Sequence, residues 1–277
     1  MKQIVLIGID GLIKDLFNEE CLKDSTLVKF FNNGSILFVN SNVPTDSAEN
    51  WGSILTGVVP KKHQLKYENL NKPYNNNNYP SLFSIILKNN VEFKVAAYVS
   101  WEPIITGMIE NTLNVDKYAP KLNEDFLSKV FIYICHYWLK NPIYDYYLVK
   151  KVLKYIEENK NTNFLFVHLV DLDEIGHIFG FNSKKYIEKL IEIDGHVKLI
   201  LDKIYKCWSD PLIVITTDHG GHGKSHGGDS DVERNVFIGS NKNINNNYKS
   251  NMSCSQIILE YLNIDIPPYF DNEPQNK

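Results

Sequence analysis

Residues 216–228 read TTDHGGHGKSHGG and follow directly on the apolar run at 211–215. This run has the length and β-branched content of a buried strand. The stretch after it places one aspartate and three histidines within nine residues: Asp218, His219, His222 and His226. Zinc prefers such carboxylate and imidazole ligands, and the glycines let the backbone bring several side chains to one point. Loops of this kind also occur as solvated turns. Evidence from other parts of the chain is therefore needed to distinguish a metal site from a solvated turn.

Two further apolar runs also lead into acidic residues. The run IVLIGI is followed by Asp10, and the run NFLFVHLV is followed by Asp171 and Asp173. In an open α/β sheet, ligands bind beyond the carboxyl ends of the parallel strands. A single aspartate after a strand is an ordinary turn former. Three strands that each end in an acid, two of them followed closely by histidine, predict a metal site at one edge of the sheet.

Strand and helix alternate along most of the chain. We expect strands at residues 3–9, 35–39, 93–99, 164–170, 212–217 and 235–239. We expect helices at residues 26–33, 47–56, 81–88, 124–139, 144–159, 183–206 and 255–262. This alternation predicts an α/β fold with helices on both faces of a mostly parallel sheet, that is, a three-layer α/β/α sandwich.

The length of 277 residues suits one domain, so we expect residues 1–277 to form a single catalytic unit. The segment from about 102 to 160 interrupts the alternation, and we expect it to contain helices only. It is rich in tyrosine and tryptophan. The alternatives for this segment are a cap over the site, an oligomer surface, or aromatic side chains that pack in an ordinary core.

Composition narrows the class of protein. A hydrophobic content of 43% suffices for a globular core, and a net charge of −4 argues against bulk binding to nucleic acid. The cysteines show no CxxC spacing, so we expect core or free thiols at Cys21, Cys135, Cys207 and Cys254. No signal peptide precedes the first strand, and the longest aromatic and apolar run, at 130–139, is too short to span a bilayer. The sequence therefore predicts a cytoplasmic protein without a transmembrane segment.

The segment PTDSAENWGSILTG, residues 44–57, offers a nucleophile. Ser47 and Thr45 lie at or just before the expected start of a helix, where free amide groups and the helix dipole favour a phosphate or an alkoxide. A serine beside a divalent metal can lose its proton near neutral pH. The alternative is a helix cap, a common role for both residue types.

At this point the chain resembles a known family. Four pieces, GIDGL, PTDSAENWGSILTGVVPKKH, DLDEIGH and TTDHGG…HGG, occur in order between residues 8 and 228. They are similar to the motifs of the type I phosphodiesterase and nucleotide pyrophosphatase family, in the alkaline phosphatase superfamily. The resemblance implies an α/β/α fold with two divalent metal ions. Zinc is the expected metal, although manganese accepts the same ligand types.

The resemblance also implies a ligand set for each metal. One metal would be held by Asp10, Asp218 and His219, with the oxygen of Ser47 as the fourth ligand. The other would be held by Asp173, His177 and His226. Asp173 is preferred over Asp171 because it begins the family pattern D-x-x-G-H. His226 is preferred over His222 because it belongs to the H-G-G that precedes a glutamate such as Glu233.

Substrate contacts are less well matched to the family. Asn50 matches the family's phosphate-contacting asparagine. The residue after the nucleophile, commonly an aromatic that stacks on the base, is Ala48 here, and the nucleophile is serine where those members use threonine. Trp101, which follows an expected strand, is available as a replacement platform; the alternative is a buried core tryptophan.

The other polar residues are expected to have structural roles. Four histidines show no partner at ligand spacing, so we expect surface or satisfied core positions for His63, His136, His168 and His196. Asp194, inside the long helix at 183–206, is expected to cap or brace a neighbouring loop.

These observations predict a hydrolase that cleaves phosphodiester or pyrophosphate bonds of a small molecule, a nucleotide in the leading interpretation. Ser47 would form a covalent intermediate. One alternative is a phosphomonoesterase or phosphomutase, which usually grips its dianion with arginine. The chain has only Arg234, although Lys61 or Lys62 could compensate. The other alternative is a non-catalytic metal-binding homologue. A sulfatase is not expected, because the C/S-x-P-x-R motif is absent.

Overall fold

The structure is a computed structural model that describes residues 1–18 and 22–276. Cys21 therefore lies outside the described residues. Within them, a sheet of seven strands has the order β2-β7-β6-β1-β5-β3-β4. The strands are β1 (Ile4–Ile9), β2 (Ser35–Asn40), β3 (Val95–Val99), β4 (Asp116–Tyr118), β5 (Phe164–Leu169), β6 (Leu212–Thr216) and β7 (Asn235–Ser240). All neighbouring pairs are parallel except those of β7, which runs antiparallel to β2 and β6.

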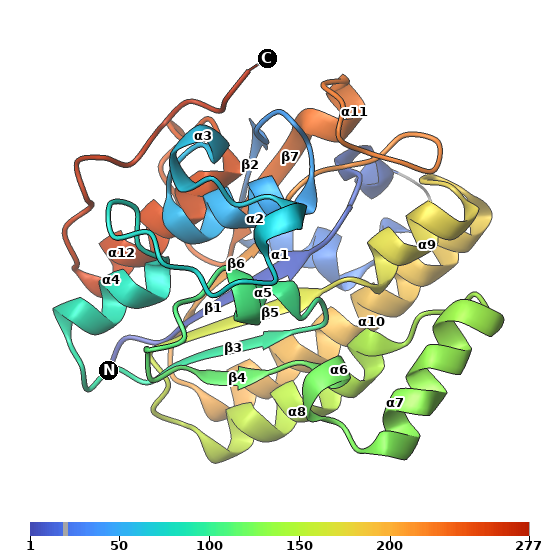
Figure 1. Cartoon of the computed structure of the whole chain (residues 1–277), viewed down its shortest axis with the longest axis horizontal. Helices are drawn as coiled ribbons and strands as arrows, with labels where there is room; N and C mark the ends of the chain where they lie inside the picture. The colour runs from blue at the N-terminus through green and yellow to red at the C-terminus, as the bar shows by residue number, and fades with distance from the viewer. Residues whose placement is uncertain (19–21, 277) are drawn as a thin grey trace.

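Helices cover both faces of this sheet (Figure 1). One core joins alternate residues of the central strands to α2 (Ser47–Thr56), α4 (Leu82–Asn89) and α12 (Cys254–Leu262). The other core joins the remaining strand residues to α1 (Thr26–Asn33), α8 (Tyr144–Glu158) and α10 (Lys184–Cys207). Since successive strand side chains point to opposite faces, apolar runs such as Ile4–Ile9 supply both cores. The predicted α/β/α sandwich with a mostly parallel sheet is confirmed.

Shorter elements connect these layers. The further helices are α3 (Pro60–His63), α5 (Pro103–Gly107), α6 (Pro120–Asn123), α7 (Phe126–Tyr133), α9 (Asp171–Phe179) and α11 (Asp231–Arg234). The 3-10 turns are η1 (Lys14–Asn18), η3 (Tyr67–Asn69) and η5 (Asn251–Ser253), and η4 (Ile134–Trp138) is a π-helical turn. Among the described residues, no helix is both long and apolar enough to cross a membrane.

The segment at 102–160 differs from the prediction of helices only. Residues Asp116–Tyr118 form β4, which pairs in parallel with β3 at the edge of the sheet. Its short length explains why hydrophobic periodicity did not reveal it. The expected helix at 124–139 is divided into α7 and η4, which lie at the periphery of the molecule in Figure 1.

The strand register brings the site together. Ile9 of β1 pairs with Leu169 of β5, and Gly8 pairs with Thr216 of β6, so the three strands end at the same level of the sheet. The acids that follow them therefore converge. Nearby, both carboxylate oxygens of Asp194 accept the N–H groups of Thr26 and Leu27 at the start of α1, at 2.9 and 2.8 Å, which agrees with its expected capping role.

Candidate two-metal site

The first group of potential ligands comes from the ends of β1 and β6. Asp10, Asp218 and His219 are buried, and one ligand atom of each lies within 4.8 Å of the others. Nε2 of His219 lies 3.2 Å from Oδ2 of Asp218 and 3.6 Å from Oδ1 of Asp10. These are the three side chains expected to hold one metal.

The second group combines α9 with the glycine-rich loop. Nε2 of His177 lies 3.2 Å from Oδ2 of Asp173, one helical turn before it, and 3.1 Å from Nε2 of His226. A second geometrically suitable trio consists of Asp173, His219 and His226. The rings of His219 and His226 stack with centroids 3.8 Å apart. The two groups are therefore adjacent, as in two-metal phosphoryl-transfer sites.

Polar atoms without partners show that these groups fit cations. Oδ2 of Asp218 and Oδ1 of Asp173 are buried and accept no hydrogen bond. A buried carboxylate oxygen without a donor costs free energy unless a positive charge compensates it. A divalent ion held by these oxygens and the neighbouring imidazoles would remove that cost. The donor set of carboxylate and imidazole suits zinc and manganese.

Protonation of the metal-free site follows from the same burial. Burial raises the pKa of Asp218 well above its usual range and lowers the pKa of His219 to about 4. Burial also opposes ionisation of Asp10, but its hydrogen bond and charge interaction with His168 outweigh this and hold its pKa at about 2. The hydrogen bond to Asp173 raises the pKa of His177 to about 9. At neutral pH, His219 therefore presents a free lone pair, whereas His177 carries a proton.

We expect metal binding to release protons. At pH 7.5 His177 is protonated in the metal-free protein, and a metal must displace that proton because only neutral imidazole coordinates. Metal affinity should therefore rise as the pH increases from 7 to 9, the range below and around this pKa. Calorimetric zinc titrations in two buffers of different ionisation enthalpy would measure about one proton or more released per protein. Equal heats in both buffers would contradict this expectation.

The nucleophile candidates are separated by their contacts. Oγ of Ser47, at the start of α2, lies 3.0 Å from Nε2 of His219 and 3.4 Å from Oδ1 of Asp10. Oγ1 of Thr45 instead donates to the carbonyl of Gly228 and accepts the N–H of Gly227. Ser47 thus faces the potential metal ligands, while Thr45 holds the glycine-rich loop.

The alternative ligands lie elsewhere. The carboxylate of Asp171 is fully buried and accepts the N–H groups of Tyr144 and Asp145 at the start of α8. His222 is exposed, and its backbone pairs with Ser225. The structure therefore brings Asp173 and His226 to the cluster, and not their neighbours. Glu233 caps α11 by accepting the N–H of Gly228 and Ser230, which shapes the end of the loop.

Asn50 is placed differently from its expected substrate contact. It is fully buried and does not line the pocket at the site. Its Nδ2 donates to the carbonyls of Asn42, Pro44 and Asp46, at 3.2, 3.0 and 3.2 Å, and its Oδ1 accepts the N–H of Asn42. These bonds occupy the amide, so Asn50 positions the loop that carries Ser47 and has no group free for a phosphate.

Sequence reasoning missed the residues that orient Asp10. His168, taken from the sequence as a satisfied core residue, is buried with Nε2 3.0 Å from Oδ2 of Asp10. Nε1 of Trp51 donates to the same oxygen at 2.9 Å, and the two rings meet edge to face. The available signal was positional: Trp51 lies one helical turn after Ser47, and His168 pairs with Gly8, two residues before Asp10.

Gly8 leaves room for this arrangement, so Gly8→Ala should weaken the site. A Cβ at Gly8 would lie 2.2 Å from Cη2 of Trp51, and the displaced indole would lose its bond to Asp10. We expect a loss of about 1–3 kcal/mol of stability from overpacking, together with weaker metal binding. Urea unfolding and zinc titration would measure both effects. Gly195→Ala on α10 is the matched control, because a Cβ there meets nothing within 4 Å; an equal loss in both variants would contradict the explanation.

A pocket of about 420 Å³ opens over the site. Ser47, Asp173, His177 and His226 line it together with Trp101, the residue expected as a stacking platform. The Trp101 ring stacks on the Tyr67 ring, with centroids 6.4 Å apart and an angle of 20°. Four carboxylates outside the predicted ligand set also line it: Asp46, Glu49, Glu68 and Glu174. Among the residues that the structure describes, no lysine or arginine belongs to the lining, so the pocket is acidic outside the metal groups.

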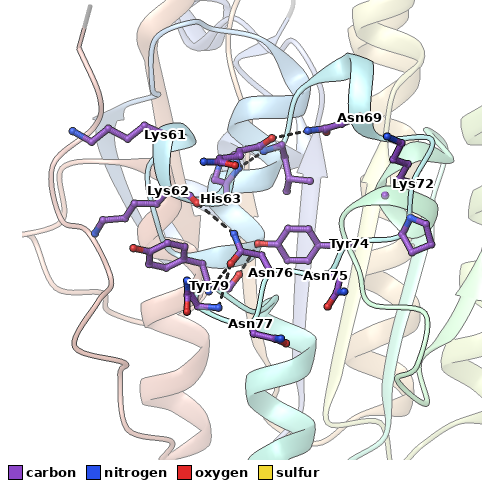
Figure 2. Close-up of a pocket in the computed structure, with 15 residues that line it drawn as sticks. Lys61, Lys62, His63, Asn69, Lys72, Tyr74, Asn75, Asn76, Asn77 and Tyr79 are labelled. Carbon is purple, nitrogen blue, oxygen red and sulfur yellow. Dashed lines mark hydrogen bonds between the residues drawn. The ribbon is translucent and has the colours of Figure 1, made fainter.

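The lysines proposed as anion partners line a different pocket (Figure 2). This larger cavity, about 880 Å³, is formed by residues 61–79 and Gly107 and contains none of the potential ligands. Nζ of Lys62 pairs with Oδ1 of Asp271 at 2.6 Å. Figure 2 shows Lys61 and Lys62 on one side of the cavity and Lys72 on the other. Arg234 bonds to Asn276. The structure therefore places Lys61 and Lys62 at a cavity separate from the candidate metal site.

The fold and the clustered ligands define an alkaline phosphatase-like protein, with acids at three strand ends and a serine at a helix start. The chain belongs to the type I phosphodiesterase / nucleotide pyrophosphatase family, whose profile matches residues 4–232. This agrees with the family predicted from the motifs.

The chain is also similar to parts of known proteins and to solved structures. The chain is 35% identical over 77 residues to GPI ethanolamine phosphate transferase 3 of Eremothecium gossypii, covering 27% of the chain and 7% of that protein. It is 33% identical over 91 residues to the Saccharomyces cerevisiae protein of the same name, covering 32% of the chain and 9% of the relative. The matches thus span less than a tenth of these two relatives. Murine ectonucleotide pyrophosphatase/phosphodiesterase 5, solved with AMP, has a TM-score of 0.69 at 11% identity, covering 100% of this chain and 97% of that one. This likeness shows the fold.

Proposed function

We propose that the protein is a two-metal phosphodiesterase in which Ser47 forms a covalent phosphoserine intermediate. The observation that carries the proposal is the position of Oγ of Ser47, within 3.4 Å of ligand atoms of both His219 and Asp10. The second observation is the start of α2, where Asp46 makes no side-chain cap bond and leaves the first N–H groups to an anion. Bound divalent ions would lower the proton affinity of the serine and neutralise charge on the phosphoryl group.

The chain's own residues account for the remaining steps. Oγ of Ser47 attacks phosphorus while its proton passes to solvent. The bond to the ester oxygen breaks on the opposite side, and the alcohol leaves after taking a proton from solvent. Amide N–H groups at the start of α2 donate hydrogen bonds to the phosphoryl oxygens as these gain charge. Water, or an alcohol acceptor, then attacks the phosphoserine and restores Ser47. Metals most consistent with the ligands are zinc first and manganese second.

The acidic pocket supports a diester over a monoester. A monoester dianion usually binds cationic side chains, and no lysine or arginine of the described residues lines this pocket. We expect the zinc-loaded protein to cleave bis(p-nitrophenyl) phosphate at least about tenfold faster, in kcat/KM, than p-nitrophenyl phosphate. A preference for the monoester would assign a phosphomonoesterase instead. Absence of turnover on every phosphoester, with two metals bound, would support the non-catalytic alternative.

The same pocket supports a phosphoester with a positively charged headgroup. Burial raises the pKa of Glu174 and of Glu49 to about 7, and the nearby charges of Lys121 and Lys66 offset this only in part. An ammonium group between these carboxylates and the stacked Tyr67 and Trp101 rings would gain ionic and cation–π contacts. The curated relatives are named ethanolamine phosphate transferases, a name consistent with this choice.

A nucleotide, the substrate class first expected, is the second candidate. The observation in its favour is the Tyr67–Trp101 stack, which could hold a base in place of the aromatic that Ala48 lacks. The acidic lining disfavours additional phosphate groups.

The two substrate classes can be distinguished by comparing two diesters that share the same p-nitrophenol leaving group. We expect kcat/KM for p-nitrophenyl phosphoethanolamine to exceed that for p-nitrophenyl thymidine 5′-phosphate by about tenfold, a difference of about 1.4 kcal/mol. Glu174→Gln should reduce the first value and leave the second nearly unchanged. Glu158→Gln, an exposed residue of α8, is the matched control. A higher value for the thymidine ester would return the assignment to a nucleotide phosphodiesterase.

A further inference from the structure

The outer face of α7 and η4 is an apolar surface without a partner in the described structure. Its large side chains are exposed to between 38% and 78%: Phe126, Leu127, Val130, Phe131, Tyr133, Ile134, Tyr137, Trp138 and Leu139. Phe126 and Trp138, at the two ends, are 77% and 78% exposed. Scattered exposed apolar residues are normal, but a contiguous patch of this kind marks an interaction site. We call these nine residues the apolar ridge; Figure 1 shows α7 at the rim of the molecule, away from the sheet.

Few residues of this segment face inward. Ile132 packs in a small cluster with Tyr144 and Val170, and Nδ1 of His136 lies 3.0 Å from the hydroxyl of Tyr144. Cys135 is also buried. The segment is therefore attached through one narrow side, and most of its circumference points outward. Folding of the main sandwich does not require the exposed side chains to be apolar.

The charges of the segment identify its partner. Residues 126–140 contain two lysines, Lys129 and Lys140, the buried His136 and no carboxylate, while the preceding Glu124 pairs with Lys151 and Asp125 caps α7. A short helix with phenylalanine, leucine, tryptophan and tyrosine on its outer side, flanked by lysines, is typical of segments that lie in the interfacial layer of a bilayer. Lysine side chains there contact anionic headgroups.

We propose that the apolar ridge inserts into the surface of a membrane that contains anionic lipids. The inner side of the same segment adjoins the pocket at the candidate metal site. Nε2 of His136 lies 3.4 Å from Oε2 of Glu174, and Trp101 packs against the cluster of Ile132, Tyr144 and Val170. Glu174, Val170 and Trp101 all line that pocket. Docking of the ridge therefore sets the pocket beside the lipid headgroups, and, resting on the proposed phosphodiesterase function, makes a membrane lipid phosphodiester its substrate class.

Vesicle flotation tests the binding directly. The full chain is mixed with vesicles of phosphatidylcholine alone or with about 30% phosphatidylserine, and the bound fraction is measured at low and high salt. We expect binding to the anionic vesicles that weakens with salt. Phe126→Ser combined with Trp138→Ser should lower the partition coefficient at least about tenfold, because two large apolar side chains no longer enter the bilayer. Lys129→Gln combined with Lys140→Gln should abolish the preference for anionic vesicles.

The control variant removes two other exposed apolar residues elsewhere. Val91 and Leu199 are 76% and 49% exposed and belong to other parts of the surface. Val91→Ser combined with Leu199→Ser should bind vesicles like the unaltered protein. Thermal melting of each variant checks that the fold is retained. Equal loss of binding in the control would overturn the assignment of the ridge.

Further outcomes separate this proposal from the proposed reaction. Absence of vesicle binding by the unaltered protein, or a dimer in sedimentation velocity that the ridge variant abolishes, would overturn membrane docking. Cleavage of soluble bis(p-nitrophenyl) phosphate should be unchanged in the ridge variant, while cleavage of a vesicle-embedded phosphatidylethanolamine should fall with the partition coefficient. If the soluble diester is not cleaved at all, the phosphodiesterase proposal fails and the binding result stands by itself. If it is cleaved without vesicle binding, only the docking proposal fails.

Discussion

Ser47→Ala is expected to lower kcat for a phosphodiester by about 10³-fold or more, because the covalent route depends on this oxygen. The fold should be retained, since Oγ of Ser47 contacts only the side chains of the candidate site, His219 and Asp10. Zinc content should stay near two ions, because three protein ligands remain for each metal. Steady-state kinetics and metal analysis of the purified variant measure these two quantities.

Two companion variants make the assignment specific. Ser47→Thr keeps a hydroxyl at the same position and should retain part of the activity. Thr45→Ala removes the bonds to Gly228 and Gly227, and should cost about 1 kcal/mol of stability with a smaller kinetic effect. If Thr45→Ala loses turnover and Ser47→Ala keeps it, the nucleophile is Thr45. If Ser47 is only a helix cap, its loss lowers the melting temperature and leaves kcat nearly unchanged.

Changes at Asp218 and His219 should have the second large effect. Both side chains are fully buried in the first ligand group, so Asp218→Ala or His219→Ala should empty one metal position. We expect at most one equivalent of zinc and a loss of turnover of about 10³-fold or more. His222→Ala is the matched control, because this exposed histidine belongs to the same loop and does not line the pocket. Retained activity in both ligand variants would show that the site lies elsewhere.

Unfolding measurements with and without zinc can show whether Asp218 is a metal ligand or a structural carboxylate. Its pKa is raised by burial, so the folded metal-free protein binds this proton more tightly than the unfolded chain does. An ionised Asp218 therefore destabilises the metal-free fold as the pH rises above the usual carboxyl range. Asp218→Asn should leave the metal-free melting temperature unchanged or raise it. It should also reduce the free energy by which zinc stabilises the fold, which is about 2.7 kcal/mol at 100 times Kd for an intact site. A large drop in metal-free stability would instead indicate a structural role.

The positions of Lys61 and Lys62 and the exposure of the apolar ridge could not be predicted from the sequence. The sequence analysis offered Lys61 or Lys62 as possible substitutes for arginine at the phosphate, yet both line the separate cavity of Figure 2. It also left three possibilities for the aromatic segment near 130, and the ridge turned out to be exposed. Periodicity describes which side of an element is apolar, but it does not say whether another element covers that side.

Short-range patterns determined the order of the elements and the edge of the sheet at which the acids meet. The apolar runs before Asp10, Asp171 and Asp218 predict strands because a two-sided buried strand needs continuous apolar side chains. Asp173 and His177 could be paired from their spacing alone, because residues four apart share one side of a helix. These inferences succeed because their physical cause lies within a few residues of chain.

Tertiary structure decided between near neighbours that local patterns treat alike. The cluster is faced by Asp173, Ser47 and His226. Their neighbours do not reach it: Asp171 and Thr45 are hydrogen-bonded to other segments, and His222 is exposed to solvent. Tertiary structure also decided which residues orient Asp10. His168 and Trp51 reach one oxygen of Asp10 from positions 158 and 41 residues away along the chain, and only the packing of β5 and α2 against β1 brings them there.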